Sequence, residues 1–478
     1  MPTPQKTFIL SIACSLLPCL LLASCTTEKY EAKPVSVEKT TAKIIAKDVA
    51  NPDFKTYLIK QGYKEAGFKE DDLPFTAWGL DELTLCALYF NPKLDVAKAQ
   101  LGLANAQIES AGQKQNPTLN GSLAHSDLAN GDKRPWAYGL NVEIPIETAN
   151  KREIRIEEAQ ANAAASRMDI ASAAWQLRNQ IAQDLIEAQQ NLASAQLLQT
   201  ELATQTEITN MLEKRVDKGL TSKPELSTAQ LSQLKSQSAL NNEQAKIAEI
   251  NARLASDVGL TLEKFKQISI KPLDIDATLS QQTSALDASF VNKNLQETAL
   301  LNRIDIRRAL AKYAAAEAKI KLEIAKQTPD ISLSPGIAFE YGDSIWSLGF
   351  SALLGFINKN TALINEAKQL REVEGAQFEA LQAQIIGDLN QHFAAFTASK
   401  QNLDQAQSQY TSQLQHMQKL QKQFDAGLID RLELRQASLA NIISQQQVLS
   451  TKFALLKAAN EIEDVIQHPI YTNLQMPN

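Results

Sequence analysis

Residues 215–226 read RVDKGLTSKPEL and residues 423–434 read QFDAGLIDRLEL, and these two stretches share one pattern. Gly219 and Gly427 stand at the same place in it. Glycine has no Cβ and adopts the left-handed conformation that ends a helix at little steric cost. We therefore expect a long helix to end at each glycine.

A new helix is expected to begin only three residues later. Ser222 and Asp430 are strong N-cap residues, because their side-chain oxygens can accept a backbone N–H from the first turn. Glu225 and Glu433 follow three positions on and complete the S/D-x-x-E pattern of a capping box. Each stretch thus predicts the tip of an antiparallel helical hairpin.

The two tips belong to an internal duplication. Gly427 follows Gly219 by 208 residues, and upstream Pro329 follows Pro117 by 212 residues. A repeat of this length exceeds the range of small solenoid units, so each copy is expected to be a whole structural module.

The N-terminus has the pattern of a lipoprotein signal. An apolar run over residues 8–23 is too short to span a membrane as a helix, and it leads into Leu22-Ala23-Ser24-Cys25. Residues 1–24 are the expected signal peptide, and Cys25 becomes the N-terminus that carries an acyl chain such as palmitate. The alternative is an ordinary signal peptide with an incidental cysteine.

The composition indicates neither an enzyme nor a nucleic-acid-binding protein. The formal net charge is −6, and the four histidines are scattered without the spacing of metal ligands. Cys86 is the one cysteine beyond Cys25, and it fits best as a small apolar residue of a helix. No nucleophile motif or phosphate loop appears. We expect no catalytic residue, metal or cofactor.

Two regions have the period-2 alternation of strands, and each strand has one apolar and one polar face. The expected hairpins lie at about residues 117–146 and 330–354. Strands of 9–11 residues are long enough to cross a bilayer at a tilt. The alternative is a pair of amphipathic hairpins on a soluble protein. The expected apolar faces consist of Leu119, Leu123, Trp136, Tyr138, Leu140, Val142, Ile144, Ile331, Leu333, Ile337, Phe339, Tyr341, Trp346, Leu348, Phe350 and Ala352.

Long helices connect the strands with the tips. No glycine or proline occurs between Thr148 and Lys218, so this stretch can run as one helix of roughly 105 Å at 1.5 Å per residue. Its counterpart runs from about Asn358 to Ala426. The expected class is mainly α with β, with long antiparallel, coiled-coil-like helical hairpins and four transmembrane strands per chain.

The expected domain organisation follows from these elements. It comprises a tether at 25–75, a first repeat at 76–259, a spacer at 260–295, a second repeat at 296–468 and a tail at 469–478.

Four strands cannot close a barrel by themselves. An open sheet edge in a bilayer leaves unpaired N–H and C=O groups, which costs several kcal/mol each. About eight strands already fill their own interior with side chains. We therefore expect three copies to associate into a 12-stranded barrel with an open lumen.

The sequence resembles the TolC-type outer-membrane efflux proteins, in particular their lipoprotein members. The resemblance extends from about Trp78 to Ile466 and rests on the order of its parts. These are Asn91-Pro92, Asn116-Pro117, the two strand pairs, Ile144-Pro145-Ile146 and the first tip, with Arg215, Gly219, Leu220, Thr221 and Ser222.

The resemblance implies a homotrimer in the outer membrane whose barrel continues into a periplasmic helical tunnel. The tips would dock with a periplasmic adaptor protein and an inner-membrane pump, and the duct would passively conduct small solutes or ions. The residues implied in docking are Arg215, Gly219, Leu220, Thr221, Ser222, Gly427, Leu428 and Asp430.

The second tip departs from the family pattern. Gln423 replaces the arginine, and Ile429-Asp430 replaces Thr-Ser. The family's entrance is often narrowed by acidic residues after this tip, and Glu433 occupies one such position. The capping box alone also explains Glu433.

Two other classes remain open at this stage. One is a periplasmic adaptor, against which the duplication argues, and the other is a lipid-anchored coiled-coil scaffold without a pore. The sequence does not identify the transported substrate.

Overall fold

The computed structural model describes residues 28–60, 77–127, 134–291, 297, 300–340, 342–353 and 358–469. The chain divides into two compact units, residues 1–46 and 47–478. In the first, α2 (Val37–Ile45) begins at Ser36, whose hydroxyl accepts the N–H of Lys39. Cys25 and the expected signal peptide lie outside the described residues.

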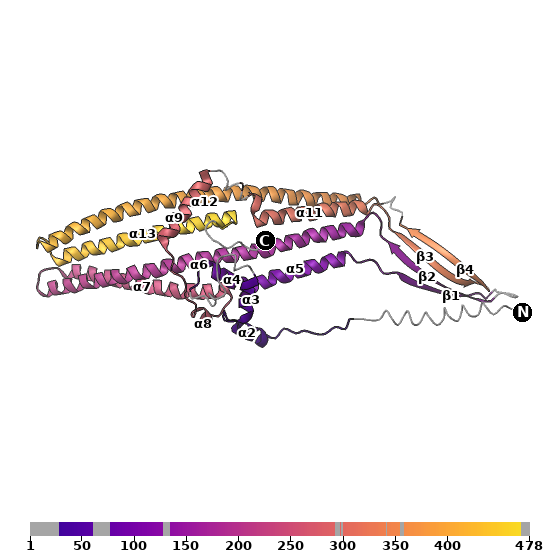
Figure 1. Ribbon diagram of the computed structural model, residues 1–478, viewed down its shortest axis with the longest axis horizontal. Helices are drawn as coiled ribbons and strands as arrows, with labels where there is room; N and C mark the ends of the chain where they lie inside the picture. The colour runs from indigo at the N-terminus through magenta and orange to yellow at the C-terminus, as the bar shows by residue number, and fades with distance from the viewer. Residues whose placement is uncertain are drawn as a thin grey trace. The chain divides into compact units, whose positions relative to one another are not determined.

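The second unit contains long helices and one sheet (Figure 1). In chain order its elements are α3 (Pro52–Lys60), α4 (Leu80–Phe90), α5 (Pro92–Ala111), β1 (Thr118–His125), β2 (Trp136–Ile146), α6 (Lys151–Asp217), α7 (Lys223–Val258), α8 (Leu262–Phe265), α9 (Ile275–Val291), α11 (Ile304–Ala325), β3 (Ile331–Glu340), β4 (Asp343–Ala352), α12 (Thr361–Asp425) and α13 (Arg431–Ile466).

The two long helices form as expected, with 67 residues in α6 and 65 residues in α12. Each pairs with its return helix, α6 with α7 and α12 with α13. In addition, α6 packs on α11 and α13, which joins the two repeats along the middle of the unit. The predicted class, mainly α with four strands, is confirmed.

The four strands form one antiparallel sheet in the order β1-β2-β3-β4. The two hairpins therefore pair with each other through β2 and β3, where Leu140 lies opposite Ile337 and Ile144 opposite Leu333. This register keeps the apolar residues predicted for the four strands on one face, whereas Ile345 lies on the other face, opposite Ala338. Tyr341, expected on that face, lies outside the described residues. Many of these apolar side chains are exposed in the single chain, with Trp346 at 79% and Phe350 at 81%.

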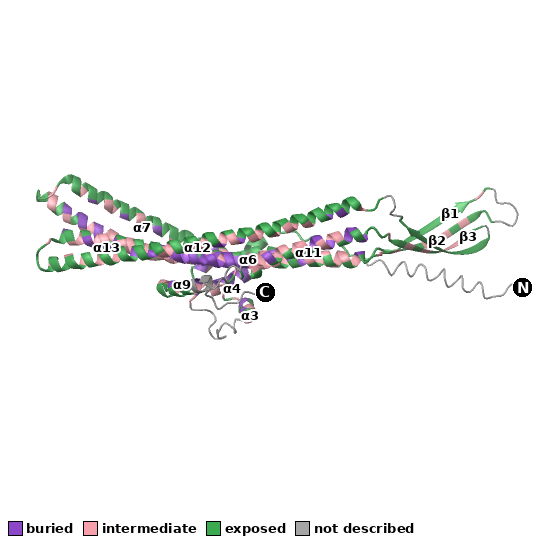
Figure 2. Cartoon of the chain, turned by 90° about the horizontal axis from the view of Figure 1, so that it is seen from above, coloured by how far each residue is buried: buried purple, intermediate pink, exposed green. Residues whose placement is uncertain are grey.

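Buried residues gather where α4 lies against α6, whereas the strands are mostly exposed (Figure 2). One core cluster joins α3, α4, α6, α7 and α8, and a second joins α6, α9, α11, α12 and α13. Cys86 is fully buried in the first cluster, and burial raises the pKa of its thiol. This agrees with its expected role as an apolar packing residue.

Two segments differ from the expectation. The segment 25–75, predicted as a tether, contains two helices among its described residues, α2 and α3. Phe54 and Leu58 of α3 are buried against Phe90 and its neighbours. The two buried residues of this short helix, four positions apart, give too weak a periodic signal to predict it.

The spacer at 260–295 is likewise ordered over most of its length. It forms α8 and α9, and it makes a parallel β-bridge between Ile270 and Trp78. Because α9 packs on α13, this segment is part of the second core rather than a plain linker.

Candidate functional site: the paired hairpin tips

Both tips have the helix ending that their glycines predict. The N–H of Leu220 donates to the carbonyl of Arg215 at 2.8 Å, and the N–H of Leu428 donates to the carbonyl of Gln423 at 2.9 Å. Gly219 and Gly427 have φ values of 70° and 73°. These are the bonds and the left-handed residue of a Schellman motif, so the predicted helix ends are confirmed.

The helix starts after the tips are also confirmed. Ser222 Oγ accepts the N–H of Glu225 at 3.4 Å, and Asp430 Oδ1 accepts the N–H of Glu433 at 3.0 Å. At both tips the structure shows the half of the expected capping box in which the cap side chain accepts the backbone N–H. At the first tip, the Glu225 carboxylate instead accepts the hydroxyl of Thr221.

An ion pair joins the two tips, with 2.6 Å between Arg215 Nη2 and Asp430 Oδ2. The Arg215 hydrogen bond is the largest cause that lowers the pKa of Asp430, and the backbone N–H of Glu433 lowers it further. Arg215 occurs only in the first repeat and Asp430 only in the second, so the two departures from the repeat pattern complement each other. This complementarity was the signal that could have predicted the pair.

Further contacts tie α13 to α6 just behind the tips. Glu207 of α6 lies 2.7 Å from Arg435 and 3.7 Å from Arg431 of α13. Beneath them, Ile208 and Leu212 pack in one small apolar cluster with residues of α7 and α13. The sequence analysis did not predict these residues, because no local pattern connects positions over 200 residues apart.

Each tip presents one large apolar side chain. Leu220 is 72% exposed and Leu428 is 74% exposed. They follow the two glycines and are fixed by the backbone bonds described above. The site therefore has two exposed leucines on rigid turns, beside a salt bridge of partly exposed groups, an arrangement suited to binding another protein rather than to catalysis.

Glu433 is exposed in the first turn of α13, where its own N–H is bound by Asp430. The capping geometry thus accounts for its backbone. Its side chain takes no part in the contacts described above for the first tip. A role in narrowing an entrance stays a prediction.

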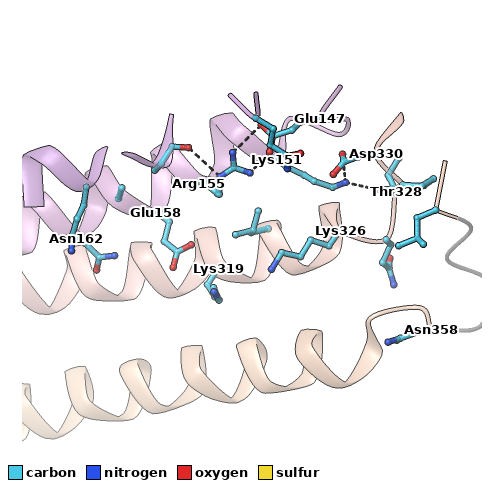
Figure 3. Close-up of a pocket in the computed structure, with 18 residues that line it drawn as sticks. Glu147, Lys151, Arg155, Glu158, Asn162, Lys319, Lys326, Thr328, Asp330 and Asn358 are labelled. Atoms are coloured by element: carbon cyan, nitrogen blue, oxygen red, sulfur yellow. Dashed lines mark hydrogen bonds and ion pairs between the residues drawn. The ribbon is translucent and has the colours of Figure 1, made fainter. Parts of the chain in front are cut away.

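At their opposite end, the long helices meet the sheet at a junction that is held by hydrogen bonds and ion pairs (Figure 3). Lys151 donates to Asp330 Oδ1 at 2.7 Å and to the carbonyl of Thr328 at 2.6 Å. Arg155 forms a two-pronged ion pair with Glu147, at 2.6 and 3.0 Å. These contacts fix the exit of β2 relative to the entry of β3, and they line a cavity of about 740 Å³.

Left-handed residues other than glycine mark the same junction. Ala149 and Asn150 precede α6 with φ values of 56° and 55°, and Asn360 precedes α12 with a φ of 57°. Asn360 donates to both the carbonyl and the carboxylate of Glu323, which holds its turn in place. In both repeats, therefore, a left-handed asparagine lies directly before the long helix.

Among the described residues, no group of three or more His, Cys, Asp or Glu side chains is placed to hold a metal ion. In the same part of the chain, none of the helices has the length and apolar character needed to cross a membrane.

Part of the chain is similar in sequence to a known protein family. Residues 86–260 match the family described as outer membrane efflux protein. No curated protein matches the chain by sequence.

Solved outer-membrane channels share the fold. The channel OprN has 16% identity and a TM-score of 0.65, with 93% of this chain and 100% of OprN covered. The outer membrane protein VceC of Vibrio cholerae has 17% identity and a TM-score of 0.63, with 82% and 97% covered. The open state of the MtrE channel of Neisseria gonorrhoeae has 18% identity and a TM-score of 0.61, with 81% and 89% covered.

The matched structures are outer-membrane channels, and they share the fold of this chain. The family match over residues 86–260 and the shared fold together confirm the resemblance to the outer-membrane efflux proteins.

Proposed function

We propose that three copies of the chain form a passive exit duct, which receives small solutes or ions from a periplasmic adaptor and an inner-membrane pump. The observation that carries this proposal is the open four-stranded sheet, whose outer strands β1 and β4 each have one unpaired edge. Joining β4 of one copy to β1 of the next satisfies those backbone groups, and three copies give 12 strands.

The helices support the same closure. Contacts run from α5 to α6, from α6 to α11 and from α11 to α12, so α5 and α12 are the outer members of this row. Val96 and Leu103 on α5 are exposed at a spacing of seven residues, and so are Leu363 and Leu370 on α12. An apolar stripe with this spacing is typical of helices that pack lengthwise on another helix. The two stripes are suited to meet between neighbouring copies.

The tips are the proposed docking surface for the adaptor. The exposed Leu220 and Leu428 supply apolar anchors, and the Arg215–Asp430 pair holds the two tips in one fixed arrangement. Both turns are rigid, so little conformational entropy is lost on binding. Glu433 is the proposed acidic residue at the entrance.

An acyl chain on Cys25 is the proposed additional anchor in the outer membrane. One lipid chain alone binds a membrane weakly, so its contribution adds to that of the barrel rather than replacing it. Replacing Cys25 by serine is expected to leave the assembled channel in the membrane.

Single-channel conductance of the purified full chain in a planar bilayer tests the duct. We expect a stable conductance from an oligomer that resists dissociation by detergent until it is heated. A folded protein without conductance would contradict the proposal and would favour a scaffold without a pore.

Leu220→Asp tests the docking surface separately, because the tip lies far along α6 from the strands. We expect export to be lost while the oligomer and its conductance persist, and Leu220→Met to retain export. Loss of the oligomer in Leu220→Asp would show that this tip serves assembly instead.

A further inference from the structure

Both repeats have a contact between a carboxylate and a nitrogen-bearing side chain at the same position of the hairpin, with the carboxylate on the opposite helix. In the first, Arg253 Nε of α7 donates to Asp184 Oδ1 of α6 at 2.9 Å. In the second, His392 Nδ1 of α12 lies 3.0 Å from Glu461 Oε2 of α13. The offset of 208 residues that relates the tips carries Asp184 to His392 and Arg253 to Glu461.

The first contact has more carboxylates than cations. The Asp184 side chain is only 1% exposed, and its Oδ1 also accepts from Gln180 at 3.1 Å. Arg253 is shared with a further carboxylate, that of Glu187. Within the described part of the chain, no N–H or O–H group reaches Asp184 Oδ2 or the buried Oδ2 of Asp257. A hydrogen bond between these two carboxyl groups requires a proton on one of them.

The other charged groups around Asp184 and Asp257 form contacts of their own or lie next to these two residues. The Lys47 ammonium donates to the carbonyl of Phe90, which lies against Gly259, two residues after Asp257. Asn91, in the turn between α4 and α5, donates to the backbone carbonyl of Asp257 rather than to its carboxylate. On the elements packed around Asp184 and Asp257, other charged side chains form the pairs Lys264–Asp48, Lys271–Glu82 and Arg178–Glu463. Asp81 lies beside Arg178.

We propose that Asp184 and Asp257 share one proton, and that this contact is a clamp that holds α7 to α6 more tightly in mildly acidic conditions than at higher pH. Loss of the shared proton adds a second negative charge beside Asp184, while its cation, Arg253, is already shared with Glu187.

The raised pKa of Asp184 agrees with the clamp geometry. Burial, and next the hydrogen bond with Asp257, raise the pKa of Asp184 to about 6 from its ordinary 3.8, against the opposing effect of Arg253. A raised pKa in the closed state means that the closed state binds the proton more tightly. The stabilisation is therefore complete below pH 3.8 and is lost as the pH rises through about 6.

Hydrogen exchange of the full chain, measured at pH 5 and pH 8 and corrected for the intrinsic pH effect, tests the clamp. With pKa values of about 6 closed and 3.8 open, protection of α6 and α7 amides around Asp184 falls about tenfold between these pH values. Protection that is equal at the two pH values in the wild-type protein would overturn the proposal, whatever the variants do.

Variants assign the effect to the named groups. Asp184→Asn removes the titrating carboxyl and keeps an acceptor for Arg253, so the pH dependence of hydrogen exchange around the clamp is expected to disappear. Asp257→Asn is expected to reduce it. Asp276→Asn, which changes an exposed carboxylate paired with Lys452, is the matched control and should leave it unchanged. Wild-type pH dependence in Asp184→Asn would refute the shared proton. None of these measurements depends on conduction, so their failure is distinguishable from failure of the duct.

Discussion

At the scale of single residues, conformation alone demands glycine at the two tips. A Cβ added to Gly219 or Gly427 would meet no atom within 4 Å, so packing gives no reason for a glycine at either position. Their φ values of 70° and 73° give that reason, because a side chain disfavours the left-handed region. This is why a local sequence pattern was sufficient to predict both helix ends.

Gly219→Ala and Gly387→Ala form a matched pair of substitutions. Both positions have open space, but Gly387 lies inside α12. We expect Gly219→Ala to destabilise the first tip by about 1–2 kcal/mol. Gly387→Ala should instead stabilise α12 by about 0.5–1 kcal/mol. Hydrogen exchange of the tip amides and thermal unfolding measure the two effects, and equal responses would contradict the argument.

The Arg215–Asp430 pair shows where prediction at this scale fails. Each residue was named from its own tip, Arg215 as part of a signature and Asp430 as a cap, and the structure confirms the cap. Their contact joins positions 215 residues apart. No pattern within one tip contains that information, and only a comparison of the two tips could have indicated it.

At the scale of elements, α6 and α13 are joined by a buried polar cluster at the middle of the long helices. Arg178 and Glu463 are 2% and 1% exposed, with their charged atoms 2.6 Å apart as an ion pair rather than an aligned hydrogen bond. Trp175 donates to Asp464 at 2.8 Å, and its ring lies 5.2 Å from the Arg178 guanidinium carbon. The cluster links one repeat to the other.

Removing only one member of the buried pair is expected to be costly. Arg178→Met leaves the Glu463 carboxylate buried without its cation, and we expect a loss of about 3–5 kcal/mol in unfolding free energy. The double variant Arg178→Met with Glu463→Leu should recover most of this loss, since apolar residues of similar volume can replace a buried pair. Thermal or denaturant unfolding in detergent measures both, and a single variant as stable as the double one would disprove the assignment.

The elements themselves were largely predictable, whereas their partners were not. The strands and the long helices follow from local periodicity, and their bounds agree within a few residues. The pairing of β2 with β3 and the packing of α3 and α9 on distant helices depend on contacts across the chain. The hydrophobic periodicity of a single sequence indicates which face of an element is apolar but not which element covers that face.

At the scale of the whole molecule, the apolar face of the sheet has no cover within the described chain over much of its area. Leu348 lies on this face, opposite Pro335, and is 74% exposed. Ser347, its neighbour in sequence, lies on the other face opposite Gly336. Substitutions at these two adjacent residues of β4 therefore test the two faces of the sheet separately.

Leu348→Arg and Ser347→Arg should differ strongly. An arginine at the lipid-facing midplane costs roughly 2–4 kcal/mol, whereas an arginine facing a water-filled lumen costs little. We expect Leu348→Arg to reduce the yield of folded oligomer in the membrane and Ser347→Arg to preserve it while changing the conductance. The opposite ranking would show that the proposed lipid and lumen faces are exchanged.

The β2–β3 contact within one chain also indicates how the proposed contact between chains would be made. Pro329 follows Pro117 by 212 residues and Trp346 follows Trp136 by 210, so β3 repeats β1 and β4 repeats β2. The observed pairing of Leu140 with Ile337 then maps onto Phe350 of one copy and His125 of the next. In evolutionary terms the proposed trimer corresponds to six half-chains in a ring, in which every second junction has become covalent. Each half-chain then needs two complementary edges, one on each of its strands, and the β2–β3 pairing preserves one such junction within the chain.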